Sequence, residues 1–324
     1  MTNENPEPFP VIESWDTYWQ GAESSAAYTG GGSSHPLVLS FWLDYFRDVQ
    51  NRDGKPKIID IASGNGAVVE SANTVFGGQL PAFTCLDVSE SAILMLEKRF
   101  PGVHGIVADA AEIPLDSASY DIATSQFGVE YAGLEAVEEM VRLLAPGGEL
   151  TLLMHHHGGI IFQECGASLD AIRDMQDANF IPACMAMFEA GYEALQGGDP
   201  ARYGAAGKQF APALQAMEAI MVQYGREVAA STILKIYRDV RTIHGRMRHY
   251  EPSAVLGWLE KMKTAIEAYT GRMASMRNAA IDATRFKQLC TDLTDKNFDI
   301  LRAEPLARSN QDQPVAWVLI SKKE

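Results

Sequence analysis

The 324-residue sequence has few cysteines, fewer basic than acidic residues, and no long apolar run. Its four cysteines, Cys85, Cys165, Cys184 and Cys290, are widely spaced and include no Cys-x-x-Cys pair. This argues against a disulfide scaffold or a zinc ribbon and favours the reduced thiols of the cytoplasm. No stretch approaches the roughly 18 apolar residues of a membrane-spanning helix. Residues 1–10 are polar and acidic, unlike a signal peptide, so we expect a cytoplasmic protein with no membrane partner.

Basic residues are also scarce: 27 Lys and Arg stand against 42 Asp and Glu, for a net charge of -15. Nucleic-acid binding draws heavily on Lys and Arg contacts with phosphates, so this balance argues against a nucleic-acid partner. A small organic molecule is the better prediction for a substrate. Because 47% of the residues are apolar, the chain has enough material for a substantial core.

Short β-branched runs alternate with helical patterns from residue 57 to 154, which is typical of a parallel sheet wound by crossover helices. The Ala-Pro-Gly-Gly sequence of 145–148 predicts a turn between the last of these helices and the strand after it. The expected strands are 57–62, 82–87, 103–108, 120–124 and 149–155. The expected helices are 67–75, 90–100 and 134–144.

Beyond Gly158 the pattern changes to long helices rich in Ala and Met, which continue to about residue 293. Two further strands, 298–304 and 315–322, are expected to complete the sheet as an antiparallel edge. The predicted domains are an α/β domain over 1–157 and 294–324 and an all-helical subdomain over 158–293, inserted between the fifth and sixth strands.

Small and acidic residues follow three successive predicted strands. The first strand runs into Ser63-Gly64-Asn65-Gly66, where the missing Cβ of Gly64 and Gly66 lets a ligand approach the main chain. Asp87 ends the second strand, where a carboxylate can accept hydrogen bonds from a ribose diol. Asp109 follows the third strand and offers an acceptor for an adenine amine. Ligands of open α/β sheets bind at the carboxyl ends of strands, so these turns together predict a nucleotide-like cofactor.

These residues resemble the class I S-adenosylmethionine-dependent methyltransferase family. The family's glycine-rich motif is similar to Asp60–Gly66, its ribose-binding acid to Asp87, its adenine-side acid to Asp109, and its turn after a helix to 144–148. Ala62 departs from the pattern, since the family often has a first glycine there. The resemblance covers roughly residues 15–155 and the two terminal strands, and it leaves the helical segment unmatched.

The resemblance implies a Rossmann-like, mostly parallel seven-stranded sheet with an antiparallel terminal strand, and S-adenosyl-L-methionine as the cofactor. It also implies methyl transfer to oxygen, nitrogen or carbon of a small organic acceptor. In this family an N-terminal helix commonly folds over the cofactor. The aromatic-rich N-terminal segment of this sequence is therefore either such a lid or an amphipathic helix docked on the sheet. The residues expected to bind the cofactor are Asp60, Ala62, Gly64, Gly66, Asp87, Val88, Asp109, Ala110, Gln126, Phe127, Tyr18 and Tyr28.

Two other functions stay open. In a nicotinamide-dependent oxidoreductase, Gly64-Asn65-Gly66 would be the start of the motif G-x-G-x-x-G/A. The last position of that motif falls on Val69, which is too large for close helix packing. A catalytically silent cofactor-binding or scaffold protein would keep the same glycines and acids. The sequence leaves the oligomeric state open, with a homodimer as one option.

Candidate catalytic residues follow the fourth and fifth strands. Glu130 lies in the segment after the fourth strand, where it could face the acceptor. His155 ends the fifth strand as the first of three consecutive histidines, and an imidazole there could act as a general base near neutral pH. The alternative for these histidines is simple exposure at a strand end. We expect no metal site, because neighbouring strand residues alternate sides and three adjacent imidazoles rarely face one ion.

One basic cluster occurs in the helical segment, formed by Arg238, Arg241, Arg246 and Arg248. It is either a solvated helix face or a site for a carboxylate, and the sequence favours the former.

Overall fold

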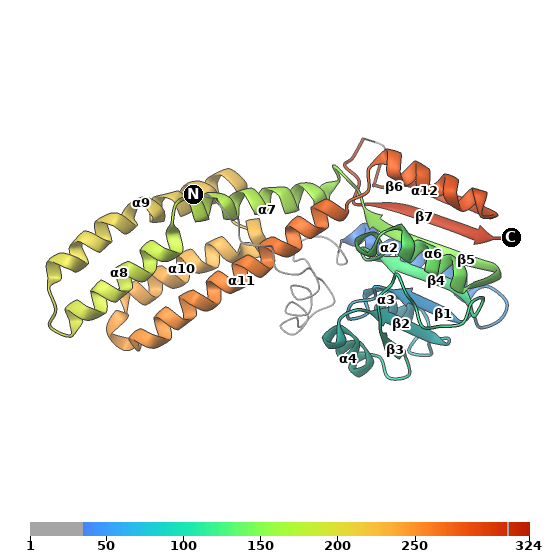
Figure 1. Cartoon of the computed structure of the whole chain (residues 1–324), viewed down its shortest axis with the longest axis horizontal. Coiled ribbons are helices and arrows are strands. Elements are labelled where there is room, and N and C mark those ends of the chain that lie inside the picture. The colour runs from blue at the N-terminus through green and yellow to red at the C-terminus, as the bar shows by residue number, and fades with distance from the viewer. Residues whose placement is uncertain (1–34, 310) are drawn as a thin grey trace. The chain divides into compact units, whose positions relative to one another are not determined.

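The computed structural model describes residues 35–309 and 311–324, which form two compact units (Figure 1). One unit is the sheet unit, residues 35–163 and 275–324, and the other is the helical unit, residues 164–274. The two predicted cofactor contacts Tyr18 and Tyr28 lie outside the described residues.

The sheet unit is built on one seven-stranded sheet with the order β3-β2-β1-β4-β5-β7-β6. Strands β1 to β5 pair in parallel, whereas β7 pairs antiparallel with both β5 and β6. The predicted mostly parallel sheet with an antiparallel strand near its end is therefore confirmed. The strands are β1 (Ile58–Ile61), β2 (Phe83–Asp87), β3 (His104–Val107), β4 (Tyr120–Gln126), β5 (Leu144–His155), β6 (Phe298–Leu306) and β7 (Ala316–Lys323).

The turn predicted over 145–148 is wrong in one respect, because β5 already begins at Leu144. Leu144 pairs with Tyr120, and the register then shifts before Ile122 meets Glu149. Gly147 adopts a positive φ of 75° within this irregular stretch. The Pro-Gly-Gly sequence thus produces a bulged start to the strand, since proline and glycine disturb a ladder without always ending it.

Helices cover both faces of this sheet. They are α2 (Pro36–Gln50), α3 (Ala67–Val75), α4 (Glu90–Arg99), α5 (Val129–Ala132), α6 (Leu134–Leu143) and α12 (Ala283–Asp295). On one face, Ile59 and Ile61 of β1 share a buried apolar cluster with Met140 of α6 and with Phe286 and Leu289 of α12. On the other face, the Phe46 ring of α2 lies 6.4 Å from the ring of Phe83. Successive strand side chains alternate between these layers.

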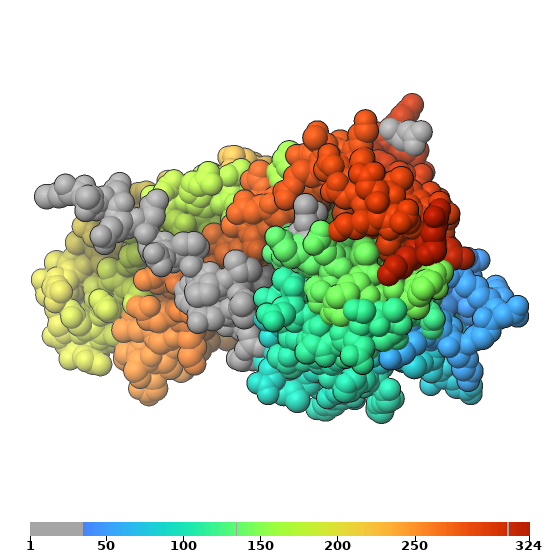
Figure 2. All heavy atoms as spheres, turned by 45° about the vertical axis from the view of Figure 1, so that its right-hand side comes forward, coloured from blue at the N-terminus to red at the C-terminus, as the bar shows by residue number. Residues whose placement is uncertain are grey.

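Helix α12 belongs with the sheet unit. Its side chains Phe286, Leu289 and Leu293 are buried in the same cluster as the strands, and the Phe286 ring stacks on Trp317 of β7 at 4.2 Å. Figure 2 shows this orange to red surface beside the green surface of the middle of the chain. The compact helical unit therefore spans 164–274, a narrower range than the predicted 158–293.

The helical unit has its own core, in which buried side chains such as Phe180, Phe188, Met217 and Ile233 pack together. No helix of the described residues is both long and apolar enough to cross a membrane. The helices that follow β5, apart from α12, are α7 (Ile160–Asp177), α8 (Phe180–Leu195), α9 (Pro200–Tyr224), η2 (Val228–Ser231), α10 (Thr232–Gly245), η3 (Met247–His249) and α11 (Pro252–Ala279).

Candidate functional site

Asp60 lies at the centre of the sheet, in β1, with no exposed surface. Its Oδ1 accepts a hydrogen bond from the Thr124 hydroxyl at 2.8 Å, while Oδ2 has no partner among the described residues. Burial raises the pKa of Asp60 to about 8, against the lowering effect of the Thr124 hydrogen bond, and the charge of Asp87 raises it further. A buried carboxyl group with a free oxygen is favourably placed to meet a cation.

Asp87 ends β2 beside the glycine-containing turn. Its Oδ2 accepts the Gly64 N–H at 2.8 Å and its Oδ1 accepts the Ser89 N–H at 2.9 Å. Burial raises the pKa of Asp87, and these backbone hydrogen bonds oppose that rise. A carboxylate has about four acceptor positions, so the two backbone bonds leave about two for the hydroxyl pair of a diol.

The turn after β1 has an unusual backbone. Ala62, Gly64 and Gly66 have φ values of 53°, 52° and 95°, in the left-handed region that favours glycine. A Cβ on Gly66 would come within 3.0 Å of the Phe100 ring, so this glycine is needed for packing against α4 and its C-terminal residue. Ala62 shows that the position where the family often has a glycine does adopt a glycine-like conformation here. Gly66 therefore supports the turn as well as being a predicted contact.

Val88, Asp109 and Ala110 come from the loops after β2 and β3. The Ala108 N–H bonds to the Asp87 carbonyl at 3.1 Å, which keeps these loops together. Val88 is 41% exposed and Asp109 is exposed, whereas Ala110 is buried. An exposed valine beside a carboxylate offers an apolar face and an acceptor to a flat ring. Ala110 lies in the core cluster below, so it supports this loop more than it lines its surface.

Gln126 ends β4, and its amide oxygen accepts the Trp42 indole N–H of α2 at 2.5 Å. Because the oxygen is engaged, the amide nitrogen points away from Trp42. The next residue, Phe127, has a positive φ of 52° that turns the chain sharply at the strand end. A Cβ on Gly128 would collide with the Cβ of Ala62, so only glycine allows the turns after β1 and β4 to approach.

Glu130 and His155 lie together at the ends of β4 and β5. The Glu130 Oε1 accepts the His155 backbone N–H at 2.8 Å, while its Oε2 has no partner among the described residues. Burial raises the pKa of Glu130 to about 7 and lowers that of His155 to about 3. The His155 ring stacks on Phe127 with centroids 4.5 Å apart. The imidazole is thus neutral and packed at pH 7, while the carboxyl group is poised to exchange a proton.

The three consecutive histidines each contact a different ring. His155 stacks on Phe127, His156 stacks on Trp317 at 4.3 Å, and His157 lies 4.4 Å from Phe162. Among the described residues no group of His, Cys, Asp and Glu is arranged to hold a metal ion. The alternative of simple exposure does not describe His155, which is 3% exposed.

Sequence reasoning missed the side chains that support this site. Trp42 holds Gln126 from 84 residues away, and Thr124 holds Asp60 from 64 residues away. Neither pair follows a spacing that a sequence could reveal. Gly128, two residues after the end of β4, was a signal that the backbone is closely approached there. Val69, which occupies the last position of the oxidoreductase motif G-x-G-x-x-G/A, is fully buried in α3.

Comparison with known proteins shows that residues 58–148 match a family described as "Methyltransferase domain". Demethylmenaquinone methyltransferase of Chlorobaculum tepidum is 28% identical over 122 residues, which cover 34% of this chain and 49% of that protein. The ubiquinone/menaquinone biosynthesis C-methyltransferase of Campylobacter jejuni is 29% identical over 132 residues, covering 39% and 54%. The chain therefore spans about half the length of these curated relatives.

Solved structures with similarity include an S-adenosylmethionine-dependent methyltransferase of Mesorhizobium loti, with 21% identity and a TM-score of 0.31 over 36% of this chain and 55% of that chain. Geranyl diphosphate C-methyltransferase of Streptomyces coelicolor has 16% identity and a TM-score of 0.35 over 46% and 66%. The family match covers β1 to the start of β5, the part of the sheet that carries the site's glycines and acids. Residues 58–148 of this chain thus match a methyltransferase domain, and these are the residues that carry the resemblance found in the sequence.

Proposed function

We propose that this protein is an enzyme that transfers the methyl group of S-adenosylmethionine to a small organic acceptor. The observation that carries the proposal is the pairing of two buried carboxyl groups, Asp60 and Asp87, at neighbouring strands inside the segment that matches the methyltransferase family. This arrangement suits a ligand that carries both a cationic amino acid part and a ribose.

The residues fit the cofactor in the following way. Asp87 would accept the ribose hydroxyls with the acceptor positions that Gly64 and Ser89 leave free. The unpartnered Oδ2 of Asp60 would face the ammonium group. Val88 and Asp109 would hold the adenine by an apolar face and an amine acceptor. Ala62, Gly64, Gly66 and Ala110 would shape the surface that the cofactor meets, while Gln126 and Phe127 would contact its methionine part.

The cofactor supplies a methyl group that is already activated on a sulfonium, so the protein's task is to align the acceptor and receive a proton. We assign proton removal to Glu130, whose pKa near 7 matches a base working at neutral pH. His155 has a pKa of about 3 and is therefore a weak base. Its role is to orient Glu130 through its backbone N–H and to orient the acceptor through its ring.

The acceptor class follows from the relatives and the charge. Two of the relatives are named as a demethylmenaquinone methyltransferase and a ubiquinone/menaquinone biosynthesis C-methyltransferase. A net charge of -15 disfavours a nucleic acid as the acceptor. We therefore propose a small organic acceptor, a cytoplasmic location, and the helices between β5 and β6 as an addition to the methyltransferase domain. A catalytically silent binding protein is the second candidate, because the cofactor residues alone do not require turnover.

Calorimetry with S-adenosylmethionine and with its demethylated product tests the cofactor site. Both compounds are expected to bind, and Asp87→Ala is expected to weaken binding by about 1 to 3 kcal/mol, the scale for hydrogen bonds to a charged group. The exposed Asp53→Ala is the matched control and should bind as the wild type does. An Asp87→Ala dissociation constant equal to that of the wild type would remove this residue from the site. A turnover screen with small acceptors then separates an enzyme from a silent binder.

A further inference from the structure

A surface pocket of about 340 Å³ lies in the helical unit, beside the short helix η3 between α10 and α11. A volume of this size suits a small organic ligand. Two arginines, two histidines and a tyrosine contribute polar groups to its wall, and no Asp or Glu lines it. The lining residues are Gly191, Ala194, Leu195, Tyr203, His244, Gly245, Arg246, Met247, Arg248 and His249.

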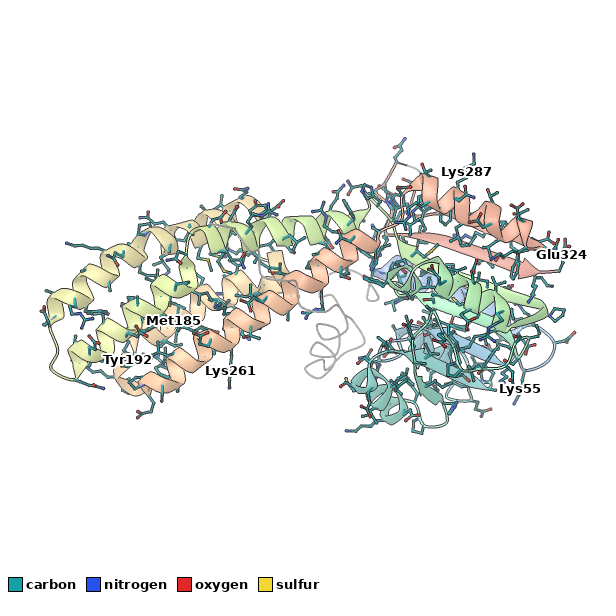
Figure 3. The ribbon with its side chains drawn as sticks, in the orientation of Figure 1. Lys55, Met185, Tyr192, Lys261, Lys287 and Glu324 are labelled. Atoms are coloured by element: carbon teal, nitrogen blue, oxygen red, sulfur yellow. The ribbon has the colours of Figure 1, made fainter. Side chains whose placement is uncertain are left out.

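The fold fixes the backbone of the two arginines on either side of a buried residue, Met247. Met247 is 7% exposed, and its methyl group packs where a Cβ on Gly191 would come within 2.5 Å. The Arg246 N–H bonds to the Ile243 carbonyl at 3.0 Å, and the His249 N–H bonds to the Arg246 carbonyl at 2.9 Å. The backbone that carries Arg246 and Arg248 is therefore held in place. Tyr192, labelled in Figure 3, follows Gly191 on α8.

Tyr203 of α9 adds a second fixed group. Its hydroxyl forms a 2.7 Å hydrogen bond with Nε2 of His244, in the last turn of α10. This bond sets the orientation of the imidazole at the pocket. The other wall is apolar and comes from Ala194 and Leu195 of α8.

Within the part of the chain that the structure describes, no acidic side chain pairs with the two arginines of this pocket. Arg246 and Arg248 form no ion pair with any residue from 35 to 309 or 311 to 324. Two other arginines of the unit are engaged: Arg202 pairs with Glu193 at 2.6 Å, and Arg241 donates to the Tyr237 hydroxyl at 2.9 Å. Arg226 and Arg238 form no ion pair among the described residues either, but they do not line the pocket. Guanidinium groups match the geometry of carboxylate and phosphate oxygens. Two guanidinium groups without an ion pair among the described residues, which line one pocket with apolar side chains in an acidic protein, indicate a site for an anion.

We propose that this pocket binds a small organic oxyanion, with its carboxylate or phosphate group between Arg246 and Arg248 and its carbon part against Leu195. The site goes beyond the proposed methyl transfer and does not rest on it. Of the four arginines in the basic cluster of the sequence, only Arg246 and Arg248 line the pocket, whereas Arg238 and Arg241 do not.

Calorimetry on the full chain at low ionic strength tests the site with phenyl phosphate, benzoate and benzyl alcohol. At least one of the two oxyanions is expected to bind, and the neutral alcohol is not. The Arg246→Gln/Arg248→Gln variant is expected to bind at least about tenfold more weakly, since each lost charge-assisted pair is worth about that much. Preference for phenyl phosphate or for benzoate identifies the oxyanion group.

The matched control is Arg226→Gln/Arg238→Gln, which removes two charges from exposed side chains of the same unit that do not line the pocket. It is expected to bind the oxyanion within about twofold of the wild type, an energy below RT. The proposal fails if neither oxyanion binds, or if both double variants lose affinity equally, which would indicate general charge attraction. Far-UV circular dichroism of the variants confirms that the exposed substitutions leave the helices intact.

Discussion

At the residue scale, two carboxyl groups of the sheet unit each have a buried oxygen atom, Oδ2 of Asp60 and Oε2 of Glu130. Burial raises the pKa of Asp60 to about 8 and that of Glu130 to about 7, and each has one oxygen without a partner among the described residues. Asp87 differs, because both of its oxygens accept backbone N–H groups. The three acids of the proposed site thus have different electrostatic surroundings, and this difference suits different ligand groups.

Asp60→Asn tests the protonation of the first of these acids. Asp60 ionises near pH 8 in the folded protein but near pH 3.9 when unfolded, so folding favours its protonated form. The folded state therefore loses stability as the pH rises from about 4 to 8, by up to about 1.4 kcal/mol per pH unit, and no further above pH 8. Relative to wild type, Asp60→Asn is expected to gain stability over this range.

Urea unfolding of both proteins at pH 5, 6.5 and 8 measures this effect, with the exposed Asp53→Asn as control. An Asp60→Asn curve that follows the wild type at all three pH values would show that the Asp60 pKa is not raised.

Glu130→Gln tests the second acid, once an acceptor has been found by the turnover screen. A carboxylate base works when ionised, so the wild-type rate is expected to rise with pH through about 7 and then level off. Glu130→Gln keeps an oxygen for the His155 N–H but cannot take a proton, and its kcat is expected to fall by about 10²- to 10⁴-fold. Calorimetry should show unchanged cofactor affinity. The exposed Glu135→Gln should retain the wild-type rate, and an equally active Glu130→Gln would refute the assignment.

At the scale of elements, local pattern predicted most of the sheet unit. The helix expected over 67–75 is α3 itself, and the expected strand 82–87 differs from β2 by one residue. Periodicity succeeds there because each strand or helix buries one repeating set of side chains. It does not reveal partners, so α12 was grouped with the helices before it although Phe286 packs in the sheet core. The start of β5 at Leu144 likewise depends on pairing with Tyr120.

In the candidate site, too, the sequence predicted the positions of residues along the chain but not their tertiary contacts. The strand-end positions of Asp60, Asp87 and Asp109 follow from chain order and from the direction of parallel strands. The left-handed conformations of Ala62 and Phe127 do not, because neither residue type favours them and the surrounding packing has to impose them. The contact of Ala62 with Gly128 joins two loops that are far apart in the sequence. Supporting contacts of this kind depend on tertiary structure, which a single sequence does not display.

At the scale of the whole molecule, the apolar residues form separate cores in the two units. The sheet core contains residues such as Ile59, Leu152 and Leu319, while the helical core contains Phe188 and Ile236. Each core is large enough to support cooperative unfolding of its own unit. A ligand that binds one unit in its folded state stabilises that unit by mass action.

Differential scanning calorimetry of the full chain is therefore expected to show two transitions. S-adenosylmethionine at about 100 times its dissociation constant should stabilise the sheet unit by about 2.7 kcal/mol and raise only its transition. The Asp87→Ala variant should show a smaller shift at the same concentration, because its affinity is lower. A single transition that moves as a whole with the cofactor would mean that the two cores unfold together, since ligand energy gained in one unit would then stabilise both.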